Sequence, residues 1–268
     1  MTPDQTTPDA PFRFTSFDDG LQILIQGASR GIGLEFVRQL LDCSQVARVF
    51  AACRDPAGSA GLQNLQDDYG ARLVPVALDL NREETIEAAA ARVAELTDRL
   101  QLLINTAGLL HDGQGLWPEK RLSQVRLDNL YKSFQVNAFG PLLVAKHFDK
   151  LLGHRQRAIF ASLSARVGSI QDNRLGGWYA YRAAKAAQNM FTRTLSLEFA
   201  RKRTGTLCVA LHPGTTDTGL SKPFQDNVPE GQLFSRAYSV RCLLQVIDGL
   251  APEDNGGFFA FDGERIEW

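Results

Sequence analysis

A glycine-rich turn joins the first apolar segment of this chain to its first amphipathic segment. Residues 21–25 form a short apolar run, Gly27, Gly31 and Gly33 follow with the spacing GxxxGxG, and residues 32–41 have helical periodicity. Glycines in this pattern allow a tight turn, close packing of helix on strand, and the approach of a pyrophosphate to the backbone. Free N–H groups at the helix start would bind the phosphates. A turn without a ligand is the alternative, but the order strand, glycine turn, helix favours a dinucleotide site.

The alternation of apolar strand and helix continues along the chain. The strand segments are short and lack a polar face, which is typical of strands buried on both faces of a parallel sheet. Parallel strands joined by helices imply right-handed crossovers. We therefore expect an α/β fold, a single-domain doubly wound parallel sheet with helices on both faces. Further strands are expected at 46–53, 73–78, 102–105, 158–164, 206–212 and 257–261, and helices at 83–100, 127–152, 179–201 and 236–250.

Composition excludes several classes of function. The 268 residues carry a formal net charge of −1, so neither nucleic acid nor a membrane surface is an expected partner. No apolar stretch reaches membrane-spanning length, and residues 1–20 lack a secretory signal pattern. We expect residues 1–20 to be a mostly disordered lead, residues 21–268 to form one domain, and the protein to be cytoplasmic. The cysteines and histidines show no metal-ligand spacing, so no metal is expected.

The end of the second strand bears on which dinucleotide is bound. An acidic residue there binds the ribose 2′-OH of NAD, whereas an arginine accommodates the 2′-phosphate of NADP. The strand ends with Cys53 and Arg54, and Arg30 in the glycine loop adds a second positive charge. Asp55 could compete with Arg54, and surface solvation is the alternative role for both arginines. Because a guanidinium pairs well with phosphate, NADP(H) is favoured over NAD(H).

Tyr181 and Lys185 stand four residues apart in a segment that is expected to be helical. This spacing places a phenol and an ammonium group on one helix face, one turn apart. The lysine can stabilise a phenolate and lower the tyrosine pKa, so that the tyrosine can give a proton to a carbonyl oxygen or take one from an alcohol. The pair alone is weak evidence, because a packing pair has the same spacing.

Several motifs, in order, resemble those of the short-chain dehydrogenase/reductase family. The glycine loop is similar to the family's TGxxxGxG, with Gln26 where Thr is usual, and residues 181–185 match its YxxxK. Residues 105–108 look like its NNAG, with Thr106 replacing the second Asn, and Asn137 matches its helix asparagine. The segments 164–182 and 257–263 also resemble the C-factor and sniffer-type carbonyl reductase branch.

The resemblance implies a Rossmann-like fold and hydride transfer between a nicotinamide and a carbonyl or alcohol substrate. It places an adenine contact after the third strand and a segment that closes over the nicotinamide after the sixth. The cofactor-binding residues it implies are Gly27, Ser29, Arg30, Gly31, Ile32, Gly33, Arg54, Asp79, Leu80, Asn105, Ala107, Gly108, Tyr181, Lys185, Pro213, Gly214, Thr216 and Thr218.

The family mechanism implies roles for Tyr181, Lys185 and Asn137. Tyr181 would be the general acid in reduction and the base in oxidation. Lys185 would favour the phenolate and hold the cofactor ribose, and Asn137 would fix a water that passes protons from Lys185 to solvent.

A serine at the end of the fifth strand would bind the substrate oxygen. Counting forward along the strand selects Ser164, whereas counting back from Gly168 selects Ala165. We expect Ser164 to be this residue, with Ser169 as the second choice and Ser162 as a further candidate.

Residues 215–235 are expected to form a mobile lid, because prolines and glycines there are interspersed with apolar residues. Leu220 and Phe224, with Trp178 near the active-site helix, suggest an apolar or aromatic carbonyl substrate. The resemblance further implies a homodimer or homotetramer, built on the helices that carry Asn137 and Tyr181.

Two other functions stay open. One is an NADP-binding signalling or regulatory protein of C-factor type with weak or no catalysis, since fold does not fix function. The intact Tyr181, Lys185 and Asn137 argue against it. The other is an epimerase-type relative acting on a nucleotide sugar, against which the length of the chain argues.

Overall fold

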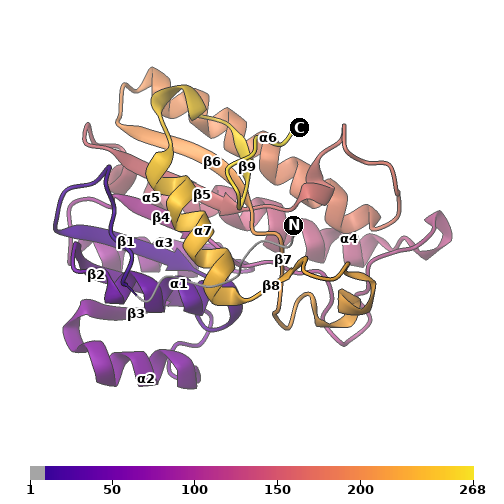
Figure 1. The fold of residues 1–268 in the computed structure, drawn as a ribbon, viewed down its shortest axis with the longest axis horizontal. Coiled ribbons are helices and arrows are strands. Elements are labelled where there is room, and N and C mark those ends of the chain that lie inside the picture. Colours follow the sequence, from indigo (N-terminus) through magenta and orange to yellow (C-terminus); the bar gives the residue numbers. More distant parts are fainter. Residues whose placement is uncertain (1–9) are drawn as a thin grey trace.

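The computed structural model describes residues 10–268, and a single parallel sheet lies at its centre (Figure 1). In this range seven strands pair in the order β3-β2-β1-β4-β5-β6-β9, each parallel to its neighbours. The strand order reverses between β1 and β4, where doubly wound sheets bind their ligands. The strands are β1 (Leu21–Gln26), β2 (Val46–Cys53), β3 (Leu73–Ala77), β4 (Leu102–Asn105), β5 (Ala158–Leu163), β6 (Thr206–His212) and β9 (Phe258–Ala260).

Helices cover both faces of the sheet. Successive strand side chains point to opposite faces, so Ile23 and Ile25 pack under α1 and α7, whereas Leu24 packs under α3 and α5. This arrangement confirms the expected Rossmann-like α/β fold. The helices are α1 (Gly31–Asp42), α2 (Ala60–Tyr69), α3 (Glu83–Ala94), α4 (Leu127–Phe134), α5 (Gly140–Leu152), α6 (Tyr179–Arg201) and α7 (Arg236–Gly249).

The helices differ from the sequence-based expectation in three places. The sequence predicts nothing at α2, because only Leu62 of this helix is buried and the apolar pattern is weak. Helix α3 ends at Ala94 rather than residue 100, since Leu100 belongs to the turn into β4. The long helix expected at 127–152 is divided between α4 and α5 by a π-helical turn at Gln135–Phe139.

Residues before the expected domain boundary at residue 21 already pack into the core. Phe12 and Phe14 are buried in the core beside α1 and α7. Thr15 and Ser16 donate backbone and hydroxyl hydrogen bonds to the Asp248 carboxylate at the end of α7. The expectation of a disordered lead therefore does not hold for residues 12–17, because apolar residues and a carboxylate partner fix them. Residues 1–9 lie outside the described range.

The segment 215–235 crosses the C-terminal edge of the sheet. It contains the short strands β7 (Thr215–Thr216) and β8 (Leu233–Phe234), which pair in parallel, and a 3-10 helix at Lys222–Asn227. Figure 1 shows this segment beside the end of the molecule that carries α4.

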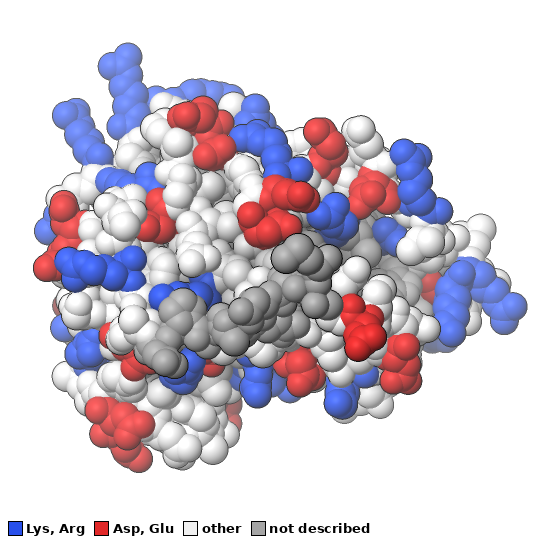
Figure 2. All heavy atoms as spheres, in the orientation of Figure 1, with Lys and Arg blue, Asp and Glu red and all other residues white. Residues whose placement is uncertain are grey.

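Charges of both signs are interspersed over the face drawn in Figure 2. None of the helices in the described range is both long and apolar enough to span a membrane. Within residues 10–268, no group of three or more His, Cys, Asp or Glu side chains is placed to hold a metal ion.

Candidate active site

The predicted site residues lie at one edge of the sheet, where the parallel strands end. Because neighbouring parallel strands run in the same direction, the loops that follow them converge at this edge. In spatial order from β3 to β6, the predicted residues at or just after the strand ends include Asp79, Arg54, Gly27, Asn105, Ser164 and Pro213.

The glycine loop needs its glycines for shape and for space. Gly27 and Gly31 have φ angles of +89° and +59°, which side chains disfavour. A Cβ on Gly27 would lie 2.6 Å from the Ala107 backbone nitrogen, and one on Gly33 would overlap the Gly27 carbonyl oxygen. Thr106 Oγ1 donates to the Gln26 carbonyl at 2.7 Å and lies 3.2 Å from the Gly27 carbonyl oxygen, which ties the loop to the segment after β4. The loop and the segment after β4 therefore form one rigid unit.

The start of α1 suits an anion. Its first turn contains no acidic side chain, and Arg30 makes no side-chain capping bond there. The positive end of the helix dipole and its free N–H groups therefore face the sheet edge. The Thr218 methyl group of the segment 215–235 is 3.7 Å from where a Cβ on Gly31 would stand. These residues fit the pyrophosphate of a dinucleotide.

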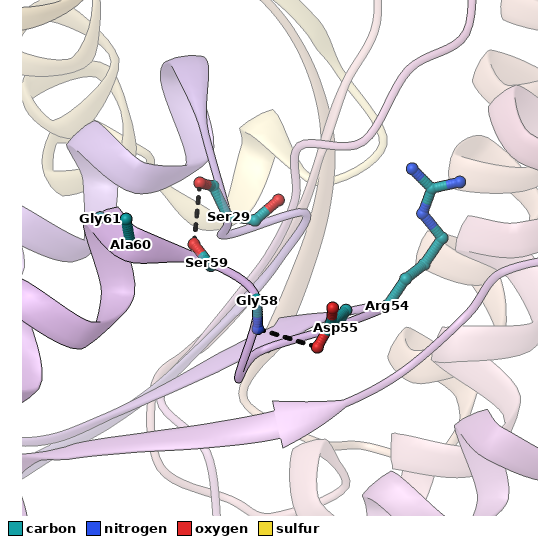
Figure 3. A pocket seen from close by; sticks show the side chains of 7 residues that line it. All are labelled: Ser29, Arg54, Asp55, Gly58, Ser59, Ala60 and Gly61. Carbon is teal, nitrogen blue, oxygen red and sulfur yellow. Dashed lines mark hydrogen bonds between the residues drawn. The ribbon is translucent and has the colours of Figure 1, made fainter.

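A hollow of about 320 Å³ opens beside the end of β2. Figure 3 shows Arg54 extended at one side of it, and Ser29 and Ser59 at the other. Ser59 Oγ donates to the Ser29 carbonyl at 3.1 Å. Asp55 Oδ1 accepts from Gly58 N at 2.9 Å, so this carboxylate caps its own loop. The sequence predicted Ser29 and Arg54 here but missed the α2 start, residues 58–61.

The residues at the ends of β3 and β4 are fixed by hydrogen bonds and close packing beneath the site. Asp79 Oδ1 accepts from Asn81 N at 3.0 Å, and Leu80 packs against Gly140 so closely that a Cβ there would be 2.9 Å from it. Asn105 is buried and donates to Ser162 Oγ at 3.2 Å. Asn105 and Ser162 thus crosslink β4 and β5 below the site.

Tyr181 and Lys185 lie together on the buried face of α6. Their side chains are 8% and 2% exposed, and Lys185 Nζ is 5.8 Å from the centre of the Tyr181 ring. The ammonium group donates to the Leu163 carbonyl and to Gln188 Oε1, both at 2.8 Å. The expected pair is therefore assembled, but the lysine is also fastened to β5.

Burial shifts the pKa of each residue in the direction that favours its neutral form. It raises the pKa of Tyr181 above its ordinary value and lowers the pKa of Lys185 to about 7. The sequence instead suggested that Lys185 lowers the tyrosine pKa. The difference arises because both groups are desolvated and the ammonium nitrogen donates to neutral oxygens rather than to the phenol.

Asn137 occupies the π-helical turn between α4 and α5. Its Oδ1 accepts from Leu109 N at 2.9 Å, and its Nδ2 donates to Leu109 O at 2.7 Å and to Ser133 Oγ at 3.1 Å. The amide thus fixes the loop after β4 to the helix. π-Helical turns within helices are frequently found at functional sites.

The serines after β5 already have partners. Ser164 Oγ donates to Asn189 Oδ1 at 2.7 Å, and Ser169 Oγ accepts from Asp172 N at 3.1 Å. Ser162 is committed to Asn105. Ala165, the position reached by counting back from Gly168, is partly exposed. A substrate oxygen would have to compete with Asn189 for the Ser164 proton.

Hydrogen bonds and close packing fix the conformation of the loop after β6. Gly214 has a φ of +71°, and a Cβ there would collide with Phe234. Thr216 Oγ1 donates to the Pro213 carbonyl at 3.2 Å. Ser239 of α7 donates to the same oxygen at 2.7 Å.

Aromatic side chains link the segment 215–235 to α6. The Trp178 ring lies 6.3 Å from the Tyr181 ring and 5.1 Å from the Phe224 ring, centre to centre. His111 and Trp117, from the loop after β4, stack at 5.4 Å and both contact Phe224. The sequence suggested Trp178 and Phe224, but it offered no signal for the other two rings.

Two buried polar residues next to the pair were also missed. Gln188 contacts Lys185, and its position three residues later in an apolar helix face could have revealed it. Glu119 is 2% exposed and caps the start of α6, where its Oε2 accepts from Ala180 N at 3.2 Å. It is 61 residues from Ala180 in sequence, and no local pattern marks it.

The fold and the glycine loop define a dinucleotide-binding α/β protein, and comparison with known proteins gives the family. Residues 22–229 match the short chain dehydrogenase family. The chain is 38% identical to C-signal of Myxococcus xanthus over 174 residues, which are 64% of this chain and 95% of that protein.

Two solved structures have the same fold. The NADPH-bound carbonyl reductase from chicken fatty liver gives a TM-score of 0.81 at 33% identity, with 93% of this chain and 100% of that chain covered. The carbonyl reductase Sniffer of D. melanogaster gives 0.81 at 28% identity, with 94% and 100% covered. The chain belongs to the short-chain dehydrogenase family and is an oxidoreductase, and its likeness to the C-factor and sniffer-type branch is confirmed.

Proposed function

We propose that the protein is an NADP(H)-dependent carbonyl reductase or alcohol dehydrogenase in which Tyr181 carries the proton. The observation that supports this most is the buried Tyr181–Lys185 pair at the same sheet edge as the glycine loop. The nicotinamide cofactor supplies or accepts the hydride when it is bound. The protein must deliver the proton and stabilise the developing oxyanion.

Tyr181 gives its phenol proton to the carbonyl oxygen in reduction and takes the alcohol proton in oxidation. Burial raises its pKa, which keeps the phenol protonated at neutral pH, the form that reduction requires. Lys185 stabilises the phenolate that remains and holds the cofactor ribose. Its buried position keeps this interaction in a low-dielectric surrounding, where it is stronger than in water.

Asn137 and Ser164 complete the proposed set. Asn137 fixes the loop after β4 and would order a water that passes protons between Lys185 and solvent. Ser164 would turn from Asn189 to donate to the substrate oxygen. Replacing Ser164 and, separately, Ser169 with Ala and measuring single-turnover hydride transfer distinguishes the two; an unchanged rate for Ser164→Ala would exclude it.

NADP(H) is the proposed cofactor rather than NAD(H). Arg54 follows β2 beside the hollow, and among the described residues it forms no ion pair. Asp55 lines the same hollow, and its Oδ1 accepts from Gly58 N at 2.9 Å, so this oxygen is directed at its own loop rather than at Arg54. The fatty liver reductase was solved with NADPH, which supports the same choice. A clear preference for NADH in kcat/KM would overturn it.

The proposed substrates are apolar or aromatic aldehydes and ketones. The chain of ring contacts from Tyr181 through Trp178 to Phe224 supports this, because the proton donor lies next to an aromatic wall. Leu220 adds an apolar contact near Gly108. A panel of aldehydes and ketones, assayed with NADPH, tests the class; activity confined to small charged substrates would refute it.

We further propose a homodimer or homotetramer in the cytoplasm. Tyr131 of α4 and Met190 of α6 are each 65% exposed, which supports burial of these helices between subunits. Light scattering tests the mass, and a monomer at all concentrations would contradict it. Subcellular fractionation tests the compartment.

The signalling alternative has one specific observation in its favour, the 38% identity to C-signal. It predicts that Tyr181→Phe leaves the biological effect unchanged while cofactor binding persists. A protein that turns over none of the panel with either cofactor would favour this alternative over the reductase.

A further inference from the structure

Gln188 lies one helical turn after Lys185, and its side-chain amide contacts the lysine ammonium group. Lys185 Nζ donates to Gln188 Oε1 and to the Leu163 carbonyl, each at 2.8 Å. Gln188 Nε2 donates to the same carbonyl at 3.3 Å. The three groups form a closed triangle where β5 ends.

The amide fits this triangle in one orientation. An ammonium group only donates, so it must meet the amide oxygen, and the Leu163 carbonyl only accepts, so it must meet the NH₂ end. Lys185 and Gln188 are 2% and 1% exposed. Because neither group reaches solvent, each needs the other to satisfy its hydrogen bonds.

We propose that Gln188 is a positioning residue, which holds the Lys185 ammonium group beside Tyr181 and stabilises its charged form. The inference rests on the proposed function, in which that ammonium group supports the phenolate. Leu163 and Gln188 take two of the three N–H groups of Lys185. The third is left for the cofactor ribose, and the ammonium charge acts on the phenolate from 5.8 Å away from the ring centre.

The protonation of Lys185 is sensitive to such an acceptor. Burial lowers the pKa of Lys185 to about 7, so a small change in its surroundings changes the charged fraction near neutral pH. An oxygen that accepts from the ammonium group raises the pKa, and removal of that oxygen lowers it.

Other ionisable groups lie on α6 or on elements packed against it. His212 of β6 is neutral at working pH, because burial lowers its pKa to about 4. Arg182 of α6 donates to backbone carbonyls. Charged side chains on neighbouring elements pair away from Lys185: Lys132 with Asp112, Lys146 with Glu83, and Arg166 with Asp172. Glu119 accepts from Ala180 N at the start of α6.

The test compares Gln188→Met, which removes the amide at similar length, with Thr192→Val. Thr192 is the matched control: it is buried one turn further along α6, and its hydroxyl bonds to the Gln188 backbone oxygen rather than to Lys185. The pKa of Lys185 is measured by NMR on ¹³C-lysine-labelled protein without cofactor, its signal assigned by loss in Lys185→Arg. The pH profile of kcat/KM with NADPH is measured alongside.

We expect Gln188→Met to lower the Lys185 pKa by about one unit. The alkaline limb of the kcat/KM profile should move by the same amount, so that kcat/KM falls about tenfold at a given pH on that limb. Gln188→Glu should move both upward, because a carboxylate favours the ammonium form. Thr192→Val should move neither. An unchanged Lys185 pKa in Gln188→Met, with activity reduced only as much as in Thr192→Val, would overturn the proposal.

Gln188→Asn covers the case in which Gln188→Met does not fold. It keeps the amide but is one methylene too short for the contact, so the same downward shift is expected, and a wild-type pKa would overturn the proposal. A wild-type protein that reduces no carbonyl would contradict the proposed function instead. The NMR titration would still decide whether Gln188 controls Lys185.

Discussion

Lys185 Nζ lies 5.8 Å from the centre of the Tyr181 ring, and both side chains are buried. Burial favours the neutral form of each group. The Tyr181 phenol is therefore protonated at neutral pH, whereas the Lys185 amine changes its protonation state near neutral pH. A small displacement of either side chain alters this balance, because charge interactions are strong where water is excluded. The residues that fix α6 and the neighbouring strand β5 therefore also determine the protonation states of Tyr181 and Lys185.

Glu119 fixes the start of the active-site helix. Its carboxylate accepts from Ala180 N, and its backbone oxygen accepts from Trp178 N at 2.5 Å. Glu119→Ala leaves a buried N–H unpaired, so we expect unfolding free energy to fall by about 1–3 kcal/mol and kcat to fall with it. Glu119→Gln keeps an oxygen acceptor and should retain most of both. Urea unfolding and steady-state kinetics check this, and equal losses in the two variants would contradict the capping role.

Substitution of Gly33 tests whether the glycine loop binds the cofactor phosphates. A Cβ at this position would overlap the Gly27 carbonyl and crowd Thr106 Oγ1, so Gly33→Ala must displace the loop. We expect NADPH affinity, measured by fluorescence titration, to fall by at least about tenfold, which corresponds to 1.4 kcal/mol. Gly249→Ala is the control, since a Cβ there meets nothing within 4 Å. Equal affinities for the two variants would count against the loop as the phosphate site.

Arg54 tests the choice of cofactor. If it pairs with the 2′-phosphate, Arg54→Ala removes a charge-assisted bond that is worth about 1.5–3 kcal/mol. The ratio of kcat/KM for NADPH over NADH should then fall by about 10–100-fold, whereas the value for NADH should stay nearly constant. NADH lacks the phosphate and serves as the internal control. An unchanged ratio would place the discrimination elsewhere.

Asp248 holds the N-terminal residues on the core. Burial raises its pKa, but hydrogen bonds from Ser16 and Thr15 outweigh this and leave the pKa below its usual range. A depressed carboxyl pKa contributes stability above the unfolded pKa, and this is lost as the pH falls through the folded value. Asp248→Ala should therefore lower the unfolding free energy by about 1–3 kcal/mol at pH 7 and by much less in acid. Asp19→Asn, an exposed change nearby, should have little effect; a pH-independent loss in Asp248→Ala would contradict the explanation.

The sequence predicts the features that depend on local spacing and strand order. The four-residue spacing of Tyr181 and Lys185 fixes their helix face, and the parallel sheet brings Gly27 and Arg54 to one edge. The contact of Lys185 with Leu163 joins residues 22 positions apart, and it depends on how α6 packs against β5. No periodicity encodes such packing, so the fastening of Lys185 to β5 could not be predicted.

The serine shows the same limit. Ser164 follows β5 as expected, but its bond to Asn189 depends on the rotation of α6 about its own axis. Two counting schemes gave Ser164 and Ala165 because the strand end and the next turn can be aligned in either register. The order of residues 12–17 could not be predicted for a related reason: Phe12 and Phe14 are separated by Arg13 and form no apolar run, and only the tertiary fold offers them a core.

Replacement of Tyr181 by Phe tests the central claim most directly. The variant keeps the ring contact with Trp178 and removes only the hydroxyl that would carry the proton. Single-turnover oxidation of bound NADPH by an aromatic ketone should slow by about 10²–10⁴-fold, while the Kd for NADPH changes little. Hydride transfer at the wild-type rate in Tyr181→Phe would contradict the claim that this tyrosine is the proton carrier.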